Sequence, residues 1–132
     1  MKSDKSTGNK FETELCEILA KHGFWYHNMT QNQAGQPADV IAVKNMIPFL
    51  IDCKVCEHDR FPLSRIEENQ RNAMELWKSC GNGSGWFALK ISTGIYMISI
   101  SFLISVSQKS LTAKDIMLAG HPLERWCECR FM

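Results

Sequence analysis

The sequence predicts an α/β domain in which helices pack against a mixed β-sheet. Two segments have apolar residues at helical spacing, and five short runs are rich in the apolar and β-branched residues of strands. Turn sequences with glycine or asparagine separate several of these segments. With 132 residues, of which 45% are hydrophobic, the chain is long enough for one core, so we expect a single domain over residues 1–132.

The first predicted helix spans residues 9–22 and follows a polar stretch, residues 1–9, that we expect to be flexible. Its apolar residues recur at i, i+4, i+7 and i+8, which places them on one helical face. Gly23 is suited to the position after the last helical residue. The apolar face consists of Phe11, Leu15, Ile18 and Leu19.

Three strands are predicted next, over residues 24–27, 38–43 and 47–55. A polar loop, residues 28–37, separates the first two. Asn45 is suited to a tight turn, so we expect the second and third strands to form a hairpin.

A second helix is predicted over residues 64–79, because Ser64 followed by Glu67 has the spacing of a capping box. Two strands, residues 86–91 and 95–100, and a helical tail over residues 105–132 complete the pattern. The residues expected to face the core from the second helix are Ile66, Ala73, Leu76 and Trp77.

Charge and hydropathy exclude a membrane protein but leave the partner open. No apolar run reaches the roughly 18 residues of a membrane span, and the charged N-terminus is not followed by the apolar segment of a signal peptide. We therefore expect a cytoplasmic protein. A net charge of +1 neither indicates nor excludes binding to nucleic acid.

The cysteines allow several interpretations. Cys53 and Cys56 have the spacing of a redox pair, and Cys127 and Cys129 near His121 could bind zinc. The spacings fit no usual zinc pattern, so reduced and mostly buried thiols are the favoured interpretation. The six cysteines are Cys16, Cys53, Cys56, Cys80, Cys127 and Cys129.

Two acids and a lysine stand in or beside strongly apolar runs, from which charge is normally excluded. Asp39 lies near the start of one predicted strand, and Asp52 and Lys54 lie near the end of the next. A buried, unpaired carboxylate is costly unless it is neutralised. Adjacent strands would bring the two acids together, and a spacing of two places Lys54 on the face of Asp52. This pattern predicts a Mg²⁺-dependent phosphodiesterase site.

The order of these residues resembles the PD-(D/E)XK nuclease superfamily, which implies a restriction-endonuclease-like mixed β-sheet flanked by helices. Within it, the chain is most similar to Holliday junction resolvases of the RecU type, over residues 8–104. The segment between Gly23 and Asp39 is too short for the protruding stalk of RecU proteins. The matching stretches are Gly8-Asn9-Lys10-Phe11-Glu12 with Gly23-Phe24, Phe61-Pro62-Leu63-Ser64-Arg65-Ile66 with Gln70 and Met74, and Gly85-Trp86-Phe87-Ala88-Leu89.

Chemistry and resemblance together suggest the roles at the site. The carboxylates of Asp39 and Asp52 would bind Mg²⁺, with Mn²⁺ as an alternative, and the carbonyl of Cys53 is a further candidate ligand. Lys54 would activate or orient water, or stabilise the charge on the phosphate. The resemblance implies that Glu12 binds the metal directly or through water, and that Gln70 contacts the same cleft as a fifth catalytic residue.

Each of these residues also has a purely structural interpretation. Asp39 could cap a turn, and Asp52 with Lys54 could form an ion pair on an edge strand. Helical periodicity does not distinguish Glu12 from Glu14, and Gln70 could be a solvated helix residue. Trp25 and Trp86 are expected in the core rather than as stacking platforms for bases.

The function predicted from the resemblance is a metal-dependent endonuclease that makes symmetric nicks in four-way DNA junctions. Because a junction is two-fold symmetric, a homodimer is expected, and the tail is a candidate for dimer contacts or for covering the core. The alternatives are a phage or mobile-element nuclease for duplexes, flaps or ends, and a DNA-binding module without activity. The candidate DNA contacts are Lys5, Lys10, Gln31, Gln33, His58 and Arg60.

Overall fold

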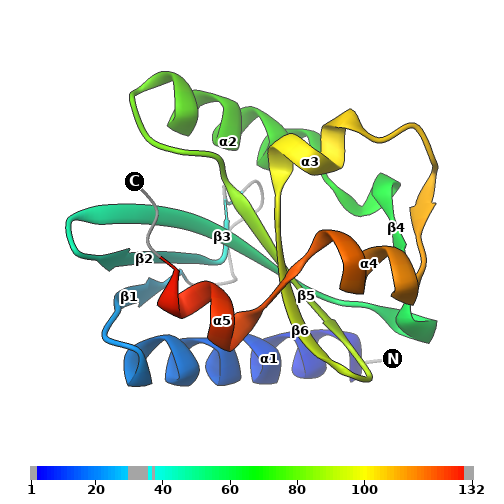
Figure 1. The fold of residues 1–132 in the computed structure, drawn as a ribbon, viewed down its shortest axis with the longest axis horizontal. Helices are drawn as coiled ribbons and strands as arrows, with labels where there is room; N and C mark the ends of the chain where they lie inside the picture. Colours follow the sequence, from blue (N-terminus) through cyan, green and yellow to red (C-terminus); the bar gives the residue numbers. More distant parts are fainter. Residues whose placement is uncertain (1–2, 30–35, 37, 130–132) are drawn as a thin grey trace.

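A six-stranded mixed sheet forms the centre of the computed structural model, which describes residues 3–29, 36 and 38–129 (Figure 1). The strand order is β1-β2-β3-β5-β6-β8. Strands β3 and β5 are parallel, and the other neighbouring pairs are antiparallel. The strands are β1 (Trp25–Asn28), β2 (Val40–Lys44), β3 (Ile47–Val55), β5 (Trp86–Ile91), β6 (Gly94–Ser99) and β8 (His121–Pro122).

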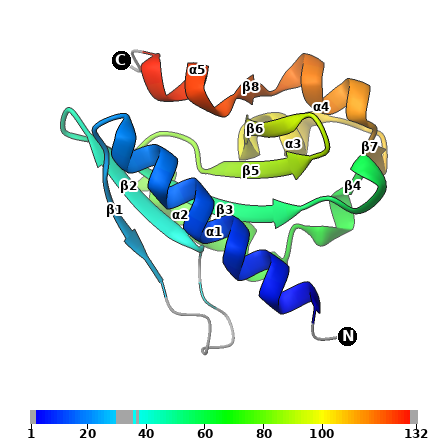
Figure 2. The same cartoon turned by 90° about the horizontal axis from the view of Figure 1, so that it is seen from below.

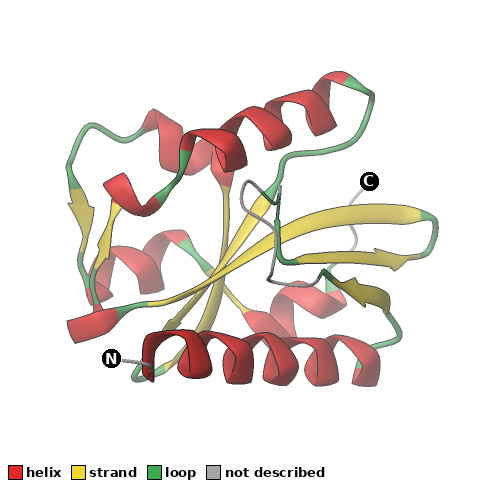
Figure 3. Cartoon of the chain, turned by 180° about the vertical axis from the view of Figure 1, so that it is seen from behind, coloured by secondary structure: helices red, strands yellow, loops and turns green. Residues whose placement is uncertain are grey.

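Helices cover both faces of this sheet, which confirms the predicted α/β class (Figures 1 and 3). One face is covered by α1 (Ser3–Lys21) and α5 (Leu123–Glu128), whose buried residues belong to one core cluster. The opposite cluster includes residues of α2 (Glu68–Ser79), α3 (Ile100–Ser105) and α4 (Ala113–Ala119). A second, two-stranded sheet pairs β4 (Phe61–Pro62) with β7 (Ser110–Leu111). Figure 2 shows α1 crossing the sheet near β2 and β3.

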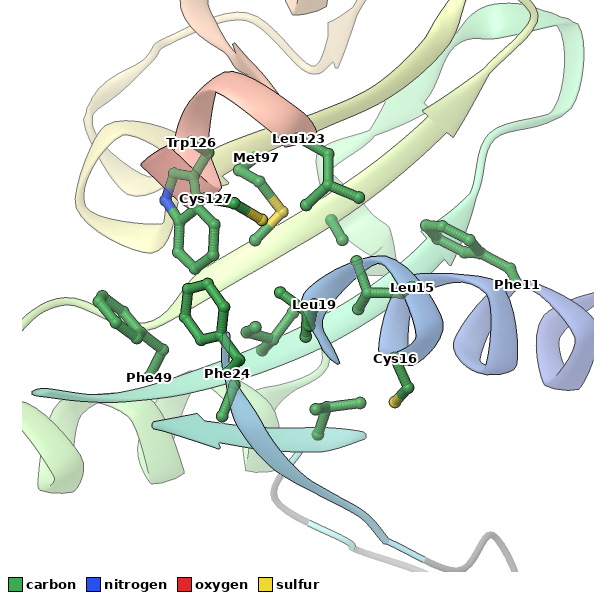
Figure 4. Packing of buried hydrophobic residues seen from close by; sticks show 14 residues of the cluster. Phe11, Leu15, Cys16, Leu19, Phe24, Phe49, Met97, Leu123, Trp126 and Cys127 are labelled. Atoms are coloured by element: carbon green, nitrogen blue, oxygen red, sulfur yellow. The ribbon is translucent and has the colours of Figure 1, made fainter. Parts of the chain in front are cut away.

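Aromatic packing at one end of the α1 face attaches the C-terminal helix to the core (Figure 4). The fully buried Trp126 of α5 stacks on Phe24 at 5.7 Å between ring centroids and meets Phe49 edge-on at 5.0 Å. Trp86 lies 5.5 Å from the same indole, as expected for a core residue. Of the two roles predicted for the tail, covering the core is therefore confirmed for α5.

The predicted hairpin between β2 and β3 is present. Its turn residues, Asn45 and Met46, both have positive φ, at 52° and 70°, as in two-residue turns whose twist matches the flanking strands. Strand β3 covers the predicted residues 47–55 without a shift. No helix among the described residues has the length and apolar content needed to cross a membrane.

Two helix starts differ from the prediction. Helix α1 begins at Ser3, so the backbone of residues 3–9 is helical rather than flexible. Helix α2 begins after Glu67, which forms the capping box with Gln70, and not after Ser64. Ser64 instead lies in a short 3-10 turn, Leu63–Arg65, that directly follows the pairing of β4 with β7. This pairing joins segments about fifty residues apart, which local capping signals do not reveal.

Two residues expected in the core are exposed. Trp25 is 62% exposed because β1 is an edge strand, and Leu76 is 65% exposed because it lies on the outer side of α2. The buried residues of α2 are Gln70 and Met74. The side of α2 that faces the sheet is therefore the side of Gln70 and Met74, and not the predicted side with Leu76. This orientation brings the Gln70 amide to the sheet.

Candidate active site

The register of β2 and β3 brings Asp39 near Asp52. The last pair in the ladder is Val40 with Ile51, so the next residues outward are the two aspartates. The backbone N–H of Asp39 donates to the Ile51 carbonyl at 3.1 Å, so the ladder ends there with a bond that departs from its register by one residue. The two acids nevertheless lie close together, because the charge and the side chain of Asp39 both contribute to raising the pKa of Asp52.

Both oxygens of the buried Asp39 carboxylate are oriented by hydrogen bonds. Oδ1 accepts from Nε2 of Gln36 at 3.1 Å, and Oδ2 accepts from the backbone N–H of Cys53 at 2.8 Å. The second bond reaches the neighbouring strand rather than a turn of the acid's own segment, so turn capping does not describe Asp39. The carboxylate is held rigidly beside the backbone that follows Asp52.

Asp52 is the most deeply buried acid of the site, at 1% exposure. Its Oδ1 accepts from Nε2 of Gln70 at 3.1 Å, and its Oδ2 lies 3.2 Å from Nζ of Lys54. This ion pair is on a central strand, between β2 and β5, so the edge-strand interpretation is wrong. The amide of Gln70 is 8% exposed, so the solvated-helix interpretation is wrong as well.

The electrostatics of Asp52 favour a cation at this position. Burial, followed by the charge of Asp39, raises its pKa from 3.8 to about 8, while Lys54 acts in the opposite direction. The buried Oδ2 has the Lys54 ammonium beside it at 3.2 Å, and this single cation only partly offsets the effect of burial and of Asp39 on the pKa of Asp52. An oxygen that is buried, weakly satisfied and next to a second carboxylate has the chemistry of a ligand for a hard divalent cation.

Glu12, and not Glu14, lies near the site. Glu12 is 6% exposed, and its charge contributes to raising the pKa of the Cys53 thiol, after burial and the charges of Asp39 and Asp52. Glu14 is half-exposed and pairs with Lys90 at 2.6 Å. Within the described part of the chain, no three acidic, histidine or cysteine side chains form a group that could hold a metal. Whether Glu12 would bind a metal directly or through water stays a prediction.

Two polar residues that the sequence analysis missed connect α2 to the site. Nδ2 of Asn69 donates to the backbone carbonyl of Gln36 at 3.1 Å, and Gln36 in turn donates to Asp39. Asn69 precedes Gln70, so the first turn of α2 contacts both aspartates, one directly and one through Gln36. The polar composition of the loop before Asp39 was the only signal for Gln36.

A cleft of about 690 Å³ is lined by several residues that include Cys53, the residue between Asp52 and Lys54. Two of the predicted DNA contacts, His58 and Arg60, line it. Lys10 is exposed elsewhere, in a shallow depression that it shares with two glutamates. The side chain of Lys5 lies outside the described part of the chain, as do Gln31 and Gln33.

Comparison with protein families identifies the chain. The model of the archaeal Holliday junction resolvase family, Hjc, matches residues 3–130. The chain belongs to this family. Hjc proteins are metal-dependent endonucleases that resolve Holliday junctions, so the chain is a junction-resolving nuclease that acts on DNA and uses a divalent metal.

A solved member has the same fold. The 1.6 Å structure of Archaeoglobus fulgidus Hjc, a Holliday junction resolvase from an archaeal hyperthermophile, superposes with a TM-score of 0.71 at 16% sequence identity. The alignment covers 91% of this chain and 99% of that one. A search of curated proteins gave no match. The resemblance was thus correct at the level of the PD-(D/E)XK resolvases, but the matching family is Hjc rather than RecU, in line with the missing stalk.

The cysteines of this Hjc chain are thiols. All six are free in the structure, and three of them, Cys16, Cys56 and Cys127, are buried. Burial raises the pKa of Cys53 well above its usual range and that of Cys56 to about 11, so neither is activated as a redox nucleophile. The group proposed for zinc is not found among the described residues.

Proposed function

We propose that this chain cuts four-way junctions at the site formed by Asp39, Asp52, Lys54 and Gln70, by attack of water on a phosphodiester. The observation that carries the proposal is the pair of neighbouring buried carboxylates, one of which keeps a strongly raised pKa in spite of the Lys54 ammonium beside it. Such a pair is costly without a bound cation, so its presence is best explained by metal binding. We place this activity in a single domain spanning residues 1–132.

Mg²⁺ is the proposed metal, with Mn²⁺ as a substitute. Mg²⁺ is commonly held by one or two protein carboxylates together with waters, which suits a site without a third acidic ligand. The carboxylates of Asp39 and Asp52 would supply the charged ligands and the Cys53 carbonyl a neutral one. The bound ion would lower the pKa of a water molecule and polarise the scissile phosphate.

The remaining residues position groups around this pair. Lys54, only 11% exposed, is held against Asp52 and can donate a hydrogen bond to the attacking water or to the charge that develops on the phosphate. Gln70 donates to Oδ1 of Asp52 and so fixes the orientation of the carboxylate that would bind the metal. Glu12 lies on the α1 side of β3 and would act through a water molecule.

We further propose that the active form is a homodimer in the cytoplasm. Resolution of a junction requires two cuts, on strands related by two-fold symmetry, and a C2 dimer carries two sites with that relationship. Sedimentation equilibrium of the free protein tests the dimer. A monomer at the concentration at which paired cuts occur would contradict it.

The test of the site is cleavage of a labelled four-way junction and a matched linear duplex, with Mg²⁺, with Mn²⁺ and with EDTA. Paired, symmetric nicks in the junction that disappear with EDTA and in Asp52→Asn support the proposal. Equal cutting of both substrates would favour the alternative of a duplex, flap or end nuclease. A folded Asp52→Asn protein that cuts as fast as wild type would refute the assigned site.

A further inference from the structure

Two arginines, Arg60 and Arg65, line the cleft together with Cys53. Only one acid, Glu57, is among the residues that line it. The neighbouring Asp59 is turned away, because its carboxylate accepts from the backbone N–H of Ser92 at 2.9 Å and from its hydroxyl at 2.5 Å. The cleft therefore presents a local excess of positive charge on a chain whose net charge is only +1.

Both arginines are fixed in place before any ligand binds. Nη1 of Arg65 donates to the Val55 carbonyl at 2.7 Å, and the guanidinium lies 6.0 Å from the ring centre of Phe61. Nη2 of Arg60 donates to the hydroxyl of Ser110 at 2.8 Å. A guanidinium has five N–H donors, so each arginine keeps donors for an anion. Planar, pre-oriented guanidinium groups suit bidentate recognition of phosphate.

The loop between them is held in an uncommon conformation. His58 and Asp59 are consecutive non-glycine residues with positive φ, at 56° and 54°. Such conformations persist only where the surroundings enforce them, and they cluster at functional sites. Here the two bonds from Ser92 to Asp59 supply that constraint. His58, which precedes both arginines in sequence, also lines the cleft.

The cleft adjoins the proposed catalytic pair at Cys53, which follows Asp52 in the chain and whose backbone N–H donates to Oδ2 of Asp39. Arg65 is bonded to Val55, which is three residues after Asp52 on β3, so its guanidinium is anchored about 10 Å along the strand at ~3.3 Å per residue. A DNA strand with one phosphate at Asp52 and Lys54 would carry a neighbouring phosphate into this part of the cleft. A volume of about 690 Å³ is sufficient for a nucleotide-sized group.

We infer that Arg60 and Arg65 form a second phosphate subsite, which binds the backbone phosphate next to the scissile one and sets the position of the strand over the metal site. This inference rests on the proposed function for the location of the cut. The proposed contacts are to phosphate oxygens, and such contacts position the strand without reading its sequence. Its contribution is to strand position and affinity, independent of sequence.

The test replaces single phosphates near the cut by neutral methylphosphonates and measures junction binding without metal, together with cleavage in Mg²⁺. In the wild-type protein, a methylphosphonate at one position beside the scissile phosphate should weaken junction binding by about tenfold. This is the usual effect of losing a charge-assisted hydrogen bond. The variants Arg65→Gln and Arg60→Gln should bind the unmodified junction with a similarly reduced affinity. In these variants, the same methylphosphonate should reduce the affinity little further. Each variant should also reduce the dependence of log affinity on log salt by about 1.

Arg71→Gln is the matched control, because Arg71 is exposed on α2 and does not line the cleft. It should bind and respond to methylphosphonates as wild type does.

If Arg65→Gln does not fold, two other variants test the subsite. Arg65→Lys keeps the positive charge but loses the planar guanidinium, and Arg60→Gln changes an exposed residue. The inference would be overturned if the Arg60 and Arg65 variants bound the junction as tightly as wild type. It would also be overturned if the methylphosphonate weakened their binding as much as it weakens that of wild type. Because binding is read without cleavage, a protein that shows the subsite but does not cut would refute only the catalytic proposal.

Discussion

Gln70 connects the first turn of α2 to Asp52 through the two ends of one amide. Nε2 donates to Oδ1 of Asp52 at 3.1 Å, while Oε1 accepts from the backbone N–H of Glu67 at 3.2 Å. The group that caps the helix is thus also the group that orients a proposed metal ligand. Residues that orient metal ligands in this way influence affinity and activity almost as much as the ligands do.

Gln70→Ala should therefore affect both stability and catalysis. We expect a loss of about 1 kcal/mol from the capping box and a ten- to hundredfold loss of junction cleavage, roughly the effect of removing a partner of a metal ligand. Glu67→Ala is the control, because it removes the other half of the same box without touching Asp52. It should match the loss of stability, measured by urea unfolding, but cleave at nearly the wild-type rate. Equal activity in the two variants would contradict the role of Gln70.

The raised pKa of Asp52 predicts how the metal-free protein responds to pH. An acid whose pKa is higher in the folded state binds a proton more tightly when folded, so its contribution to stability is complete below its ordinary pKa of 3.8 and is lost as the pH rises through about 8. In EDTA, the melting temperature of wild type should fall from about pH 5 to about pH 9 relative to Asp52→Asn. Mg²⁺ should reverse the loss in wild type only. Parallel profiles for the two proteins would show that Asp52 does not carry this proton.

Lys54→Met should separate metal binding from chemistry. Lys54 lowers the pKa of Asp52, but the proposed ligands are the carboxylates, so Mg²⁺ should still bind, as measured by calorimetry. The rate of junction cleavage should fall by roughly a hundredfold or more, because the donor to the water or phosphate is gone. If cleavage persists at the wild-type rate with saturating Mg²⁺, Lys54 has only a structural role.

Glu12 and Glu14 form a matched pair for testing the first helix. Glu12→Gln should reduce cleavage, because the buried Glu12 carboxylate acts near Cys53 and the two aspartates. Glu14→Gln should leave the rate unchanged and cost less than about 1 kcal/mol, since its ion pair with Lys90 is about half-exposed. The measurement is the single-turnover rate on a junction. A larger loss in Glu14→Gln than in Glu12→Gln would reverse the assignment.

The sequence predicted the sheet and the neighbouring aspartates because both depend on local patterns. Strand β3 is nine residues long and mostly apolar, and the turn at Asn45 fixes its register against β2 up to the pair of Val40 with Ile51, which brings the adjacent Asp39 and Asp52 near each other. By contrast, helical periodicity could not choose Glu12 over Glu14. Only the packing of α1 shows which of the two carboxylates is buried.

The features that the sequence did not reveal depend on long-range contacts. Phe61 pairs with Leu111, and a short 3-10 turn follows this pairing. As a result, α2 begins at Glu68 and not at residue 64 as predicted. The bonds from Gln36 to Asp39 and from Asn69 to Gln36 join a polar loop to a helix 33 residues away in sequence. A contact of this kind leaves no periodic signal in either segment, so neither residue could be selected in advance.

Trp25, which was expected in the core, and Trp126 of the C-terminal tail give the final test, because only Trp126 is buried. Trp126 is fully buried and packs against Phe24, Phe49 and Trp86, so Trp126→Ala should cost about 3–5 kcal/mol of unfolding free energy through lost burial and a cavity. Trp25 is 62% exposed on an edge strand, so Trp25→Ala should change stability by no more than about 0.5 kcal/mol. Urea unfolding followed by circular dichroism compares the two. Similar losses in both variants would mean that α5 does not cover the core in solution as it does in the structure.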